Sequence, residues 1–220
     1  MKILELFAGT RSIGKAFEEN GHEVYSVEWD KKFSNIDLYA DIGKLSSEEI
    51  LLKFGKPDVI WASPDCSSYS IAAISHHRRK ESNGNLAPYS EYAKFCDEVN
   101  MNMIKIIKEL NPKYYFIENP RGGMRKMNFM KEFPRYTVTY CQYGDSRMKP
   151  TDIWTNHEKP MFKPMCHNGD PCHESAPRGS KTGTQGLKDS AERSIIPHDL
   201  CRHIVDICEK GGKNDTNEYV

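Results

Sequence analysis

The chain has 220 residues and a mass of 25.3 kDa, which is long enough for one substantial domain but short for two. Its 31 Lys and Arg residues balance its 31 Asp and Glu residues, so a polycationic tail protein is excluded; a nucleic-acid partner stays open, because local charge decides it. No apolar run approaches the roughly 20 residues of a membrane span, and no signal-peptide pattern begins the chain. Seven scattered cysteines favour reduced thiols. We expect a cytoplasmic protein with no membrane partner.

Short apolar runs alternate with helical patterns over the first two thirds of the chain. Strands are predicted at residues 2–8, 23–28, 58–62 and 114–117. Helices are predicted at residues 12–20, 46–54 and 92–110. Ser46 and Glu49 form a capping box at the start of the second helix, and Phe95 is placed on the apolar face of the third. This alternation predicts βαβ units, a parallel sheet and an α/β fold.

The last third of the chain has a different pattern. Strands are expected at residues 136–143 and 152–155, with a turn around Gly144 and Pro150 between them. Residues 157–190 are loop-like and rich in Pro, Gly, Ser, Lys and Cys, and a helix follows at about residues 197–209. We therefore divide the chain into a core (residues 1–156), an insertion (157–192), a closing helix (193–210) and a fraying tail (211–220).

A small-residue turn, F-A-G-T-R-S-I-G at residues 7–14, lies between the first predicted strand and helix. Such a turn either brings backbone N–H groups and a helix N-terminus to a ligand or is a tight turn with no ligand. Glu28 ends the next strand, about 20 positions on, where an acidic residue can bind a ribose diol. Trp29 either offers an aromatic face to a purine or packs in the core. Asp41 either accepts a hydrogen bond from an exocyclic amine or is a solvated loop residue.

Two further polar segments follow predicted strands. Cys66 lies in S-P-D-C-S-S-Y-S at residues 63–70, at the carboxyl end of a strand, where α/β proteins bind ligands. It is either a nucleophile, if a helix N-terminus or a cation lowers its pKa, or a small buried residue; its polar neighbours favour the nucleophile. Glu118 comes directly after another strand, where partial burial would raise the pKa of its carboxyl; the alternatives are a surface acid or a helix cap.

Taken together and in this order, the motifs resemble the DNA cytosine-5 methyltransferases. That family has an F-A-G-x-G-G cofactor loop, a P-P-C-x-x-x-S nucleophile loop and an E-N-V strand end. Y-G-D-S-R-M-K at residues 143–149 is similar to its arginine-bearing motif, and S-I-I-P-H-D-L at residues 194–200 to its closing N-x-V-P helix. The resemblance spans about residues 3–208. It implies a Rossmann-like S-adenosylmethionine-dependent methyltransferase fold, a single domain with a small loop-rich insertion.

The resemblance also implies the cofactor, the substrate and the site residues. S-adenosylmethionine would be bound by residues of the first loop and of the strand ends: Phe7, Ala8, Gly9, Thr10, Ser12, Ile13, Gly14, Glu28, Trp29, Asp41, Ile42, Ser63, Pro64 and Ser194. The methyl group would go to C5 of cytosine in DNA. Catalysis would be carried by Cys66, which adds to C6, Glu118 at N3, Asn119, which holds the loop, and Arg147 or Lys149 at the base or the nucleophile loop.

The chain departs from the family pattern at several positions. Asp65 replaces the second proline before the nucleophile, Pro120 replaces the valine after Glu-Asn, and Q-x-R-x-R is reduced to Arg147-x-Lys149-x-Thr151. The target-recognition domain shrinks to about residues 157–190. We expect a compact, nucleoid-associated branch encoded by a virus or a mobile element. An RNA cytosine-5 methyltransferase and a catalytically impaired nucleic-acid-binding module are the alternatives, and a partner subunit for recognition stays open.

Two basic segments and a cysteine–histidine cluster complete the candidates. Residues 71–89, with H-H-R-R-K at 76–80, and residues 121–135, with five cations against Glu132, either contact DNA phosphates or are solvated faces. Cys166, His167, Cys172 and His173 lie within eight residues. They are candidate zinc ligands with His157 as a possible fourth, although the spacing is not that of a standard finger.

Overall fold

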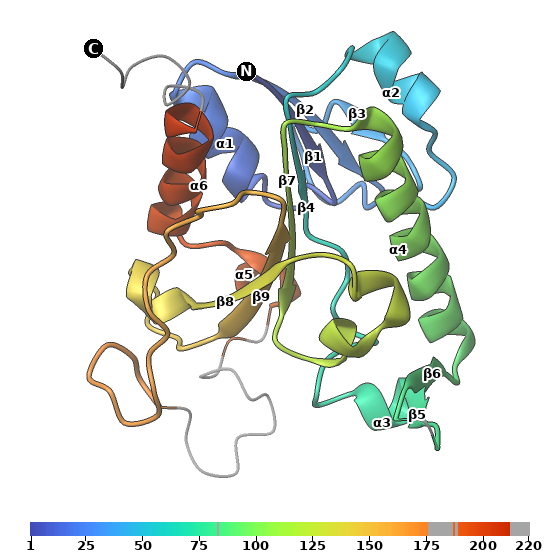
Figure 1. Ribbon diagram of the computed structural model, residues 1–220, viewed down its shortest axis with the longest axis vertical. Coiled ribbons are helices and arrows are strands. Elements are labelled where there is room, and N and C mark those ends of the chain that lie inside the picture. Colours follow the sequence, from blue (N-terminus) through green and yellow to red (C-terminus); the bar gives the residue numbers. More distant parts are fainter. Residues whose placement is uncertain (83, 176–186, 188, 212–220) are drawn as a thin grey trace.

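In the computed structural model, residues 1–82, 84–175, 187 and 189–211 are described, and they form a seven-stranded sheet between two layers of helices (Figure 1). The sheet order is β3-β2-β1-β4-β7-β9-β8. Five strands are parallel: β1 (Lys2–Leu6), β2 (Glu23–Glu28), β3 (Leu38–Tyr39), β4 (Val59–Ala62) and β7 (Tyr114–Pro120). Two antiparallel pairings add β9 (Pro150–Thr155), next to β7, and β8 (Arg135–Thr139). The predicted α/β fold with a parallel sheet is confirmed.

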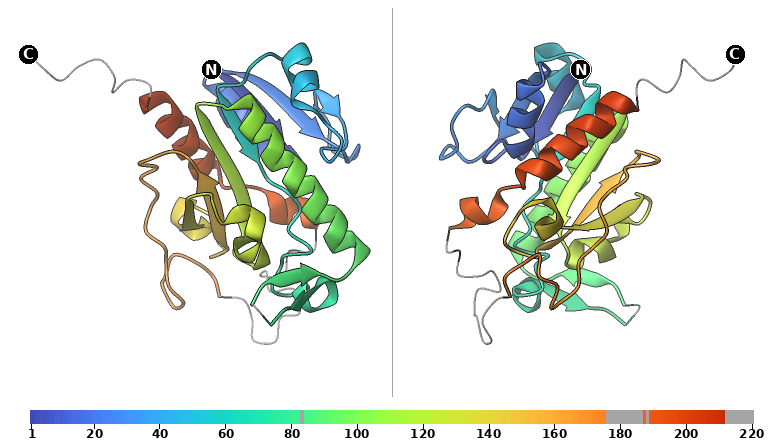
Figure 2. Two further views of the ribbon diagram at one scale, coloured as in Figure 1. Left: turned by 45° about the vertical axis from the view of Figure 1, so that its right-hand side comes forward. Right: turned by 90° about the vertical axis from the view of Figure 1, so that its left-hand side faces the viewer.

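Helices cover both faces of the sheet, as Figure 2 shows. On one face lie α1 (Ser12–Glu19), the 3-10 turn η3 (Tyr140–Tyr143) and α6 (His198–Lys210). On the other lie α2 (Ser47–Lys53), α4 (Glu91–Leu110) and the short turns η1 (Gly123–Lys126) and η2 (Asn128–Met130). The central strand β4 reads Val-Ile-Trp-Ala and is buried throughout, because a parallel strand between two helical layers has no solvent face.

A small subdomain and a short helix lie outside these layers. Helix α3 (Ile74–His77) leads into an antiparallel hairpin of β5 (Arg78–Lys80) and β6 (Leu86–Pro88), which lies below the carboxyl ends of the strands in Figure 1. Helix α5 (Ser190–Ser194) precedes the closing helix α6. Within the described part of the chain, no helix is both long and apolar enough to cross a lipid bilayer.

Several predicted elements differ from the observed ones. Strand β1 stops at Leu6 because Phe7 has a φ of 56°, and β7 continues through Glu118 to Pro120 because β9 pairs with it along this stretch. Residues 140–143 were predicted as strand but form η3, which ends at Gly144 with a φ of 86°. Phe95, predicted on the apolar face of α4, is 43% exposed. The cap at Ser46 is confirmed, since its Oγ accepts from the Glu49 N–H at 3.2 Å. The predicted tail from residue 212 onward lies outside the described residues.

The sheet order changes direction between β1 and β4. From β1 the chain moves to β2 and β3, whereas β7, β9 and β8 lie beyond β4. In open α/β sheets, the crevice outside the carboxyl ends of the strands at such a switch point is where ligands bind. The register aligns Leu6 with Ala62 and Ala62 with Ile117, so the segments that follow these residues meet at one edge.

Candidate functional site

The loop after β1 makes a sharp turn at this edge. Phe7, Gly9 and Arg11 all have left-handed backbone conformations, with φ values of 56°, 49° and 57°. The turn is fastened to β2, because the Ala8 N–H donates to the Val27 carbonyl and the Gly9 N–H donates to Glu28 Oε2 at 2.9 Å. Such a loop presents backbone groups rather than side chains to whatever binds above it.

Glu28 and Trp29 lie side by side at the end of β2. The Glu28 carboxylate is 6% exposed, and its Oε1 accepts from the N–H groups of Trp29 at 2.8 Å and Asp30 at 3.0 Å. Together with the Gly9 N–H, these make three backbone donors that hold the carboxylate in one orientation. The Trp29 side chain is 68% exposed, so core packing is excluded as its role.

The remaining residues predicted at the cofactor site fall into two groups. Asp41 and Ile42 follow β3 at the same edge; Asp41 Oδ1 accepts from the Gly43 N–H at 2.9 Å, while the Ile42 side chain is buried. Ile13 is fully buried, and the Gly14 N–H donates to Glu5 at 3.0 Å in the interior, so these two shape the start of α1.

The closing segment of the chain reaches the same loop. Ser12 Oγ lies 2.9 Å from Thr10 Oγ1 and accepts from the Ile196 N–H at 3.3 Å. Ser194, two residues earlier, is exposed, and its hydroxyl donates to the Ala191 carbonyl at 2.7 Å. The segment that leads into α6 therefore meets the predicted cofactor loop.

Cys66 lies in the loop that follows β4. Its carbonyl accepts from the N–H groups of Tyr69 at 3.0 Å and Ser70 at 2.8 Å, and the Ser67 N–H donates to Asp65 at 2.6 Å. Burial, together with the nearby carboxylates of Asp65 and Glu118, raises the pKa of the Cys66 thiol to about 11. Lys149 lowers it, but less strongly. The lowered pKa that we required of a nucleophile is therefore not present in the free protein.

A buried arginine supports this loop from the far side. Arg78 donates to the Ser68 carbonyl at 2.9 Å and to Asp97 at 2.8 and 3.0 Å, and its guanidinium lies 4.1 Å from the centre of the Tyr69 ring. The Tyr69 hydroxyl donates to Asp97 at 2.6 Å and accepts from Asn100. Arg78 lies in the basic segment that we expected either to contact DNA phosphates or to form a solvated face. Neither holds for this residue, which is 3% exposed because Asp97 on α4 pairs with it.

Glu118 lies within β7, beside the nucleophile loop. It is 6% exposed and accepts from the Tyr140 hydroxyl at 3.0 Å. Burial raises the pKa of Glu118, as expected from its position, while the charge of Lys149 and hydrogen bonds from Tyr140 and Ser63 lower it. The surface acid and the helix cap are both excluded as alternatives.

Asn119 connects β7 to the nucleophile loop. Its side-chain N–H donates to the Pro64 carbonyl at 2.9 Å, two residues before Cys66, and its Oδ1 is buried without a partner. Ser63, at the start of the loop, accepts from the Trp61 indole at 2.8 Å. Ser63 and Pro64, the first two residues of the loop, are thus held by side chains of β4 and β7.

Of the two predicted cations, only Lys149 faces these groups. Its ammonium donates to the Arg193 carbonyl at 2.8 Å, lies 4.4 Å from the centre of the Tyr140 ring, and interacts electrostatically with both Glu118 and Cys66. Burial lowers the pKa of Lys149. Arg147 instead forms a close ion pair with Asp145. Tyr140, which joins Glu118 to Lys149, was missed because it lay inside a predicted strand, where an aromatic residue is ordinary.

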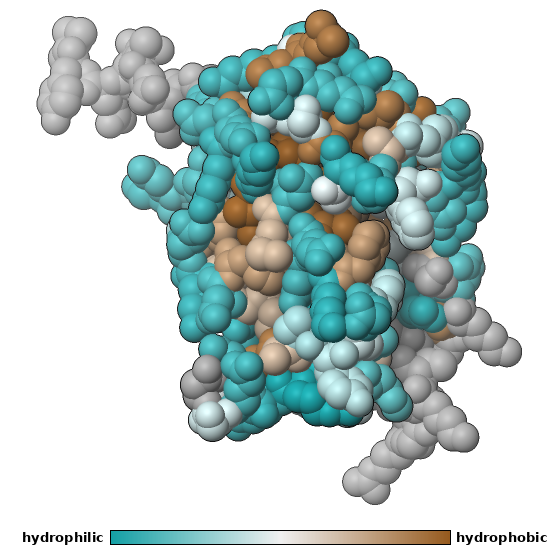
Figure 3. Space-filling model, turned by 90° about the vertical axis from the view of Figure 1, so that its right-hand side faces the viewer, coloured by the Kyte–Doolittle hydropathy of each residue, from teal (hydrophilic) through white to brown (hydrophobic). Residues whose placement is uncertain are grey.

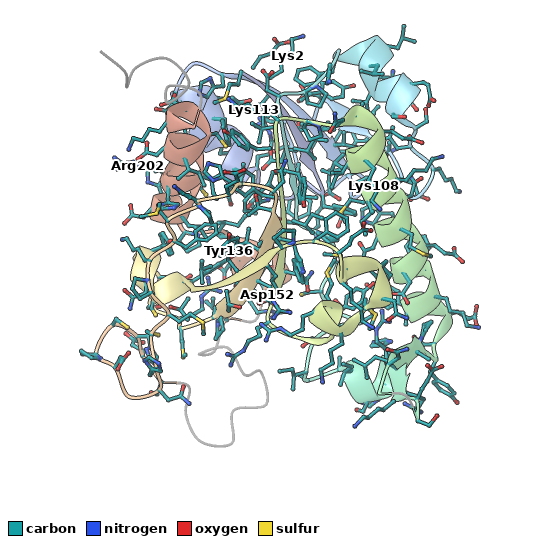
Figure 4. All side chains as sticks on the ribbon, viewed as in Figure 1. Lys2, Lys108, Lys113, Tyr136, Asp152 and Arg202 are labelled. Atoms are coloured by element: carbon teal, nitrogen blue, oxygen red, sulfur yellow. The ribbon has the colours of Figure 1, made fainter. Side chains whose placement is uncertain are left out.

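The basic segments are less available than the sequence indicated. Arg125 donates to Asp152, which is fully buried in the middle of β9, labelled in Figure 4. Arg79 lies over the Tyr89 ring at 4.2 Å. The exposed cations that remain in the two segments include Lys80, Arg121, Lys126 and Lys131. Figure 3 shows the α4 side of the molecule, which is mostly hydrophilic over its lower half, where the β5–β6 hairpin lies.

The candidate zinc ligands come together only in part. Cys166, Cys172 and His173 lie close to one another, but the other two histidines do not join them. His157 packs against Tyr114, with its Nε2 3.2 Å from the Ile207 carbonyl oxygen, and His167 is exposed next to Asp170. His157 is therefore not the fourth member of the cluster.

Comparisons with known proteins agree with this geometry. The model of the family "C-5 cytosine-specific DNA methylase" matches residues 1–141. The chain is 32% identical over 225 residues to the "Probable DNA (cytosine-5)-methyltransferase" of Frog virus 3 (isolate Goorha), covering 94% of this chain and 100% of the relative. It is 30% identical over 137 residues to the type II methyltransferase M.FnuDI of Fusobacterium nucleatum, covering 58% of this chain and 35% of the relative.

A solved structure has the same fold. The Entamoeba histolytica methyltransferase EhMeth superposes with a TM-score of 0.52 at 12% identity, covering 77% of this chain and 57% of that one. The chain thus spans the whole of the viral relative, but only about a third of the bacterial relative and a little over half of the solved structure.

Proposed function

The chain belongs to the C-5 cytosine-specific DNA methylase family and is an S-adenosylmethionine-dependent enzyme of this type, and on that premise we propose that it methylates cytosine in DNA through a covalent bond to Cys66. The observation that carries the proposal is the convergence of three groups at the carboxyl edge of the sheet. The thiol of Cys66, the carboxyl of Glu118 and the ammonium of Lys149 come from three different segments and influence one another electrostatically.

Cys66 and Glu118 divide the activation of the base. The Cys66 thiol gives its proton to water and its sulfur bonds to C6 of the ring, which moves electron density toward C5 and N3. Glu118, whose pKa is raised by burial, donates a hydrogen bond to N3 from its protonated form and balances the charge that develops there. After the methyl group has been accepted, loss of the C5 proton and of the Cys66 sulfur restores the aromatic ring.

Lys149 and Asn119 are positioning residues in this scheme. Because the Cys66 pKa is about 11, most of the thiol is protonated in the free protein, and Lys149 is the cation that favours the thiolate. Asn119 fixes the backbone at Pro64 and so aims the loop. The unpartnered Oδ1 of Asn119 is buried at the same place.

The residues at the end of β2 fit the donor of the methyl group. S-adenosylmethionine supplies an electrophilic methyl when it is bound. The fixed Glu28 carboxylate suits a ribose diol, the exposed Trp29 ring suits an adenine face, and the turn at Gly9 lies at the same edge, before the N-terminus of α1. Asp41, which follows β3, would accept from the adenine amine, and Ser63, Pro64 and Ser194 would complete the rim.

A duplex substrate requires that the target base leave the stack. Extrusion of a paired base costs a few kcal/mol, which contacts from the protein must offset. The β5–β6 hairpin and the exposed cations Lys80 and Arg121 lie on the polypeptide that leads into and out of the site. A virus as the source of the gene is supported by the viral relative, which the chain matches over 94% of its length.

Covalent trapping tests the proposal directly. The full chain is incubated with S-adenosylmethionine and a duplex pool of random sequence in which 5-fluorocytosine replaces cytosine. A fluorine at C5 cannot be removed by a base as the C5 proton is, so the covalent adduct persists. We expect a complex that survives denaturing electrophoresis with the wild type and with Cys208→Ala, which removes a thiol buried in α6. The complex should be absent with Cys66→Ala.

Each other outcome overturns part of the proposal. A complex that persists in Cys66→Ala would exclude this nucleophile. Tight binding of the duplex with no complex would identify a nucleic-acid-binding module without activity. A complex formed only with an RNA pool of the same composition would make RNA the substrate.

A further inference from the structure

Four sulfur and nitrogen atoms meet beside η3, away from the proposed catalytic groups. Cys141 of η3 joins Cys166, Cys172 and His173 of the insertion, and their ligand atoms all lie within 4.8 Å of one another. Cys141 lies 25 residues from Cys166, so no local motif links it to the others. Cys141 and Cys166 are buried, and Cys172 reaches the surface.

The spacing of these atoms is close to that of a tetrahedral shell, although Cys141 Sγ and Cys166 Sγ lie nearer to each other than zinc would hold them. Zinc–sulfur bonds of about 2.3 Å and zinc–nitrogen bonds of about 2.0 Å place sulfur atoms about 3.8 Å apart, and sulfur about 3.5 Å from nitrogen. The observed Sγ–Sγ distances are 3.0 Å for Cys141–Cys166 and 3.6 Å for Cys141–Cys172. His173 Nδ1 is 3.7 Å from Cys166 Sγ and 3.8 Å from Cys172 Sγ.

The polypeptide around the cluster has little else to order it. Between residues 157 and 175, only Pro160 and Cys166 are buried. Hydrogen bonds run from the Cys166 N–H to Thr139 at 3.0 Å and from the Glu174 N–H to the Ser146 carbonyl at 2.9 Å. A segment with so small an apolar interior commonly depends on a metal or a disulfide for its fold.

We propose that Cys141, Cys166, Cys172 and His173 bind one structural zinc ion that fastens the insertion to the catalytic core. Four protein ligands with no open position are typical of structural rather than catalytic zinc, and three thiolates with one imidazole are a common set. The metal acts on the core through Cys141, because the next residue toward the N-terminus is Tyr140, whose hydroxyl donates to Glu118. Zinc therefore fixes the turn that carries a partner of the proposed catalytic acid.

The test is the metal content of the full-length chain, produced without a histidine tag and kept reduced. Mass spectrometry of the dissolved elements should find one zinc per wild-type chain. We expect at least a tenfold lower zinc content in Cys166→Ser, Cys172→Ser and His173→Ala. The matched controls are His167→Ala, adjacent to Cys166, and Cys208→Ala, a thiol outside the cluster; both should keep the full zinc content.

A second measurement covers variants that fail to fold. The wild-type chain, stripped of metal and reloaded with cobalt(II), should develop the thiolate-to-cobalt charge-transfer absorption and the intense visible bands of a tetrahedral site. A folded wild-type chain without zinc, which also gives no such absorption with cobalt, would overturn the proposal. So would a Cys141–Cys166 disulfide in the freshly purified protein, detected by its intact mass before and after reduction.

Discussion

Glu5 offers a quantitative test of how the cofactor loop is supported. This residue lies on β1 and is 2% exposed; its Oε1 accepts from the Gly14 N–H at 3.0 Å, and its Oε2 lies 3.8 Å from Arg11 Nε. Burial raises the pKa of Glu5 from 4.5 to about 7, although the Gly14 N–H and the charge of Arg11 both lower it. The carboxyl therefore holds its proton more tightly in the folded chain than in the unfolded one.

The sign and size of the effect on stability follow from this difference. Below pH 4.5 the Glu5 carboxyl is protonated in both the folded and the unfolded chain, and its contribution to the free energy of unfolding is fully present. This contribution is lost as the pH rises to about 7. At about 1.4 kcal/mol per pH unit, the loss is about 3 kcal/mol. Glu5→Gln cannot ionise, so its free energy of unfolding relative to wild type should rise by about 3 kcal/mol over this range.

Urea unfolding of the two full-length proteins at several pH values between 4.5 and 8 measures the difference directly. Glu18→Gln is the matched control, because it removes the other carboxylate near Arg11 but one that is 43% exposed; its difference from wild type should change little with pH. Parallel stability curves for wild type and Glu5→Gln would refute the reasoning, since they would mean that burial does not perturb this carboxyl.

Four further predictions follow from the site. Glu28→Ala should weaken S-adenosylmethionine binding in calorimetry by about 1.5–3 kcal/mol, the loss typical of a charge-assisted hydrogen bond, and unchanged affinity would place the ribose elsewhere. Lys149→Met should move the pH profile of Cys66 alkylation, followed by mass spectrometry, to higher pH, because it removes the cation that favours the thiolate. Arg78→Ala should destabilise the chain by about 3–5 kcal/mol in urea, since it leaves Asp97 without its partner, whereas Arg79→Ala at the surface should not. Lys80→Ala should lower the slope of log affinity for DNA against log salt by about one.

The positions of Glu28, Cys66 and Glu118 were predictable because they depend on local pattern and one topological rule. Each residue lies at or near the carboxyl end of a strand with a strong apolar signal, and parallel strands bring those ends to one edge. Neither the extension of β7 past Glu118 nor the 3-10 turn at Tyr140 followed from pattern. The extension of β7 results from pairing with β9, and the turn begins where the pairing of β8 with β9 ends at Thr139; a single sequence does not contain either register.

The residues that sequence reasoning missed act over long separations. Arg78 is sequestered by Asp97 on α4, and Cys141 meets the insertion cysteines across at least 25 residues of sequence. In the sequence, Arg78 lies in a basic run, and Cys141 lies in a predicted strand with no second cysteine nearby. The sequence therefore indicated that Arg78 lies at the surface, whereas the fold buries its charge. The sequence also placed the cysteine–histidine cluster within one segment, whereas the fold adds Cys141 of the core to it.

The altered arginine motif can now be interpreted in physical terms. Lys149 has a φ of 30° and supplies a buried cation next to Glu118 and Cys66. Thr151 occupies the position of the last arginine in the motif. It is uncharged, fully buried in β9, and donates to the Lys149 carbonyl at 3.1 Å, so this position supplies no cation to the nucleophile loop. Support for that loop comes instead from Asn119 at its start and Arg78 near its end. A chain with a reduced cation set can still hold its nucleophile in place, because Asn119 lies on β7 and Arg78 is fixed by Asp97 on α4.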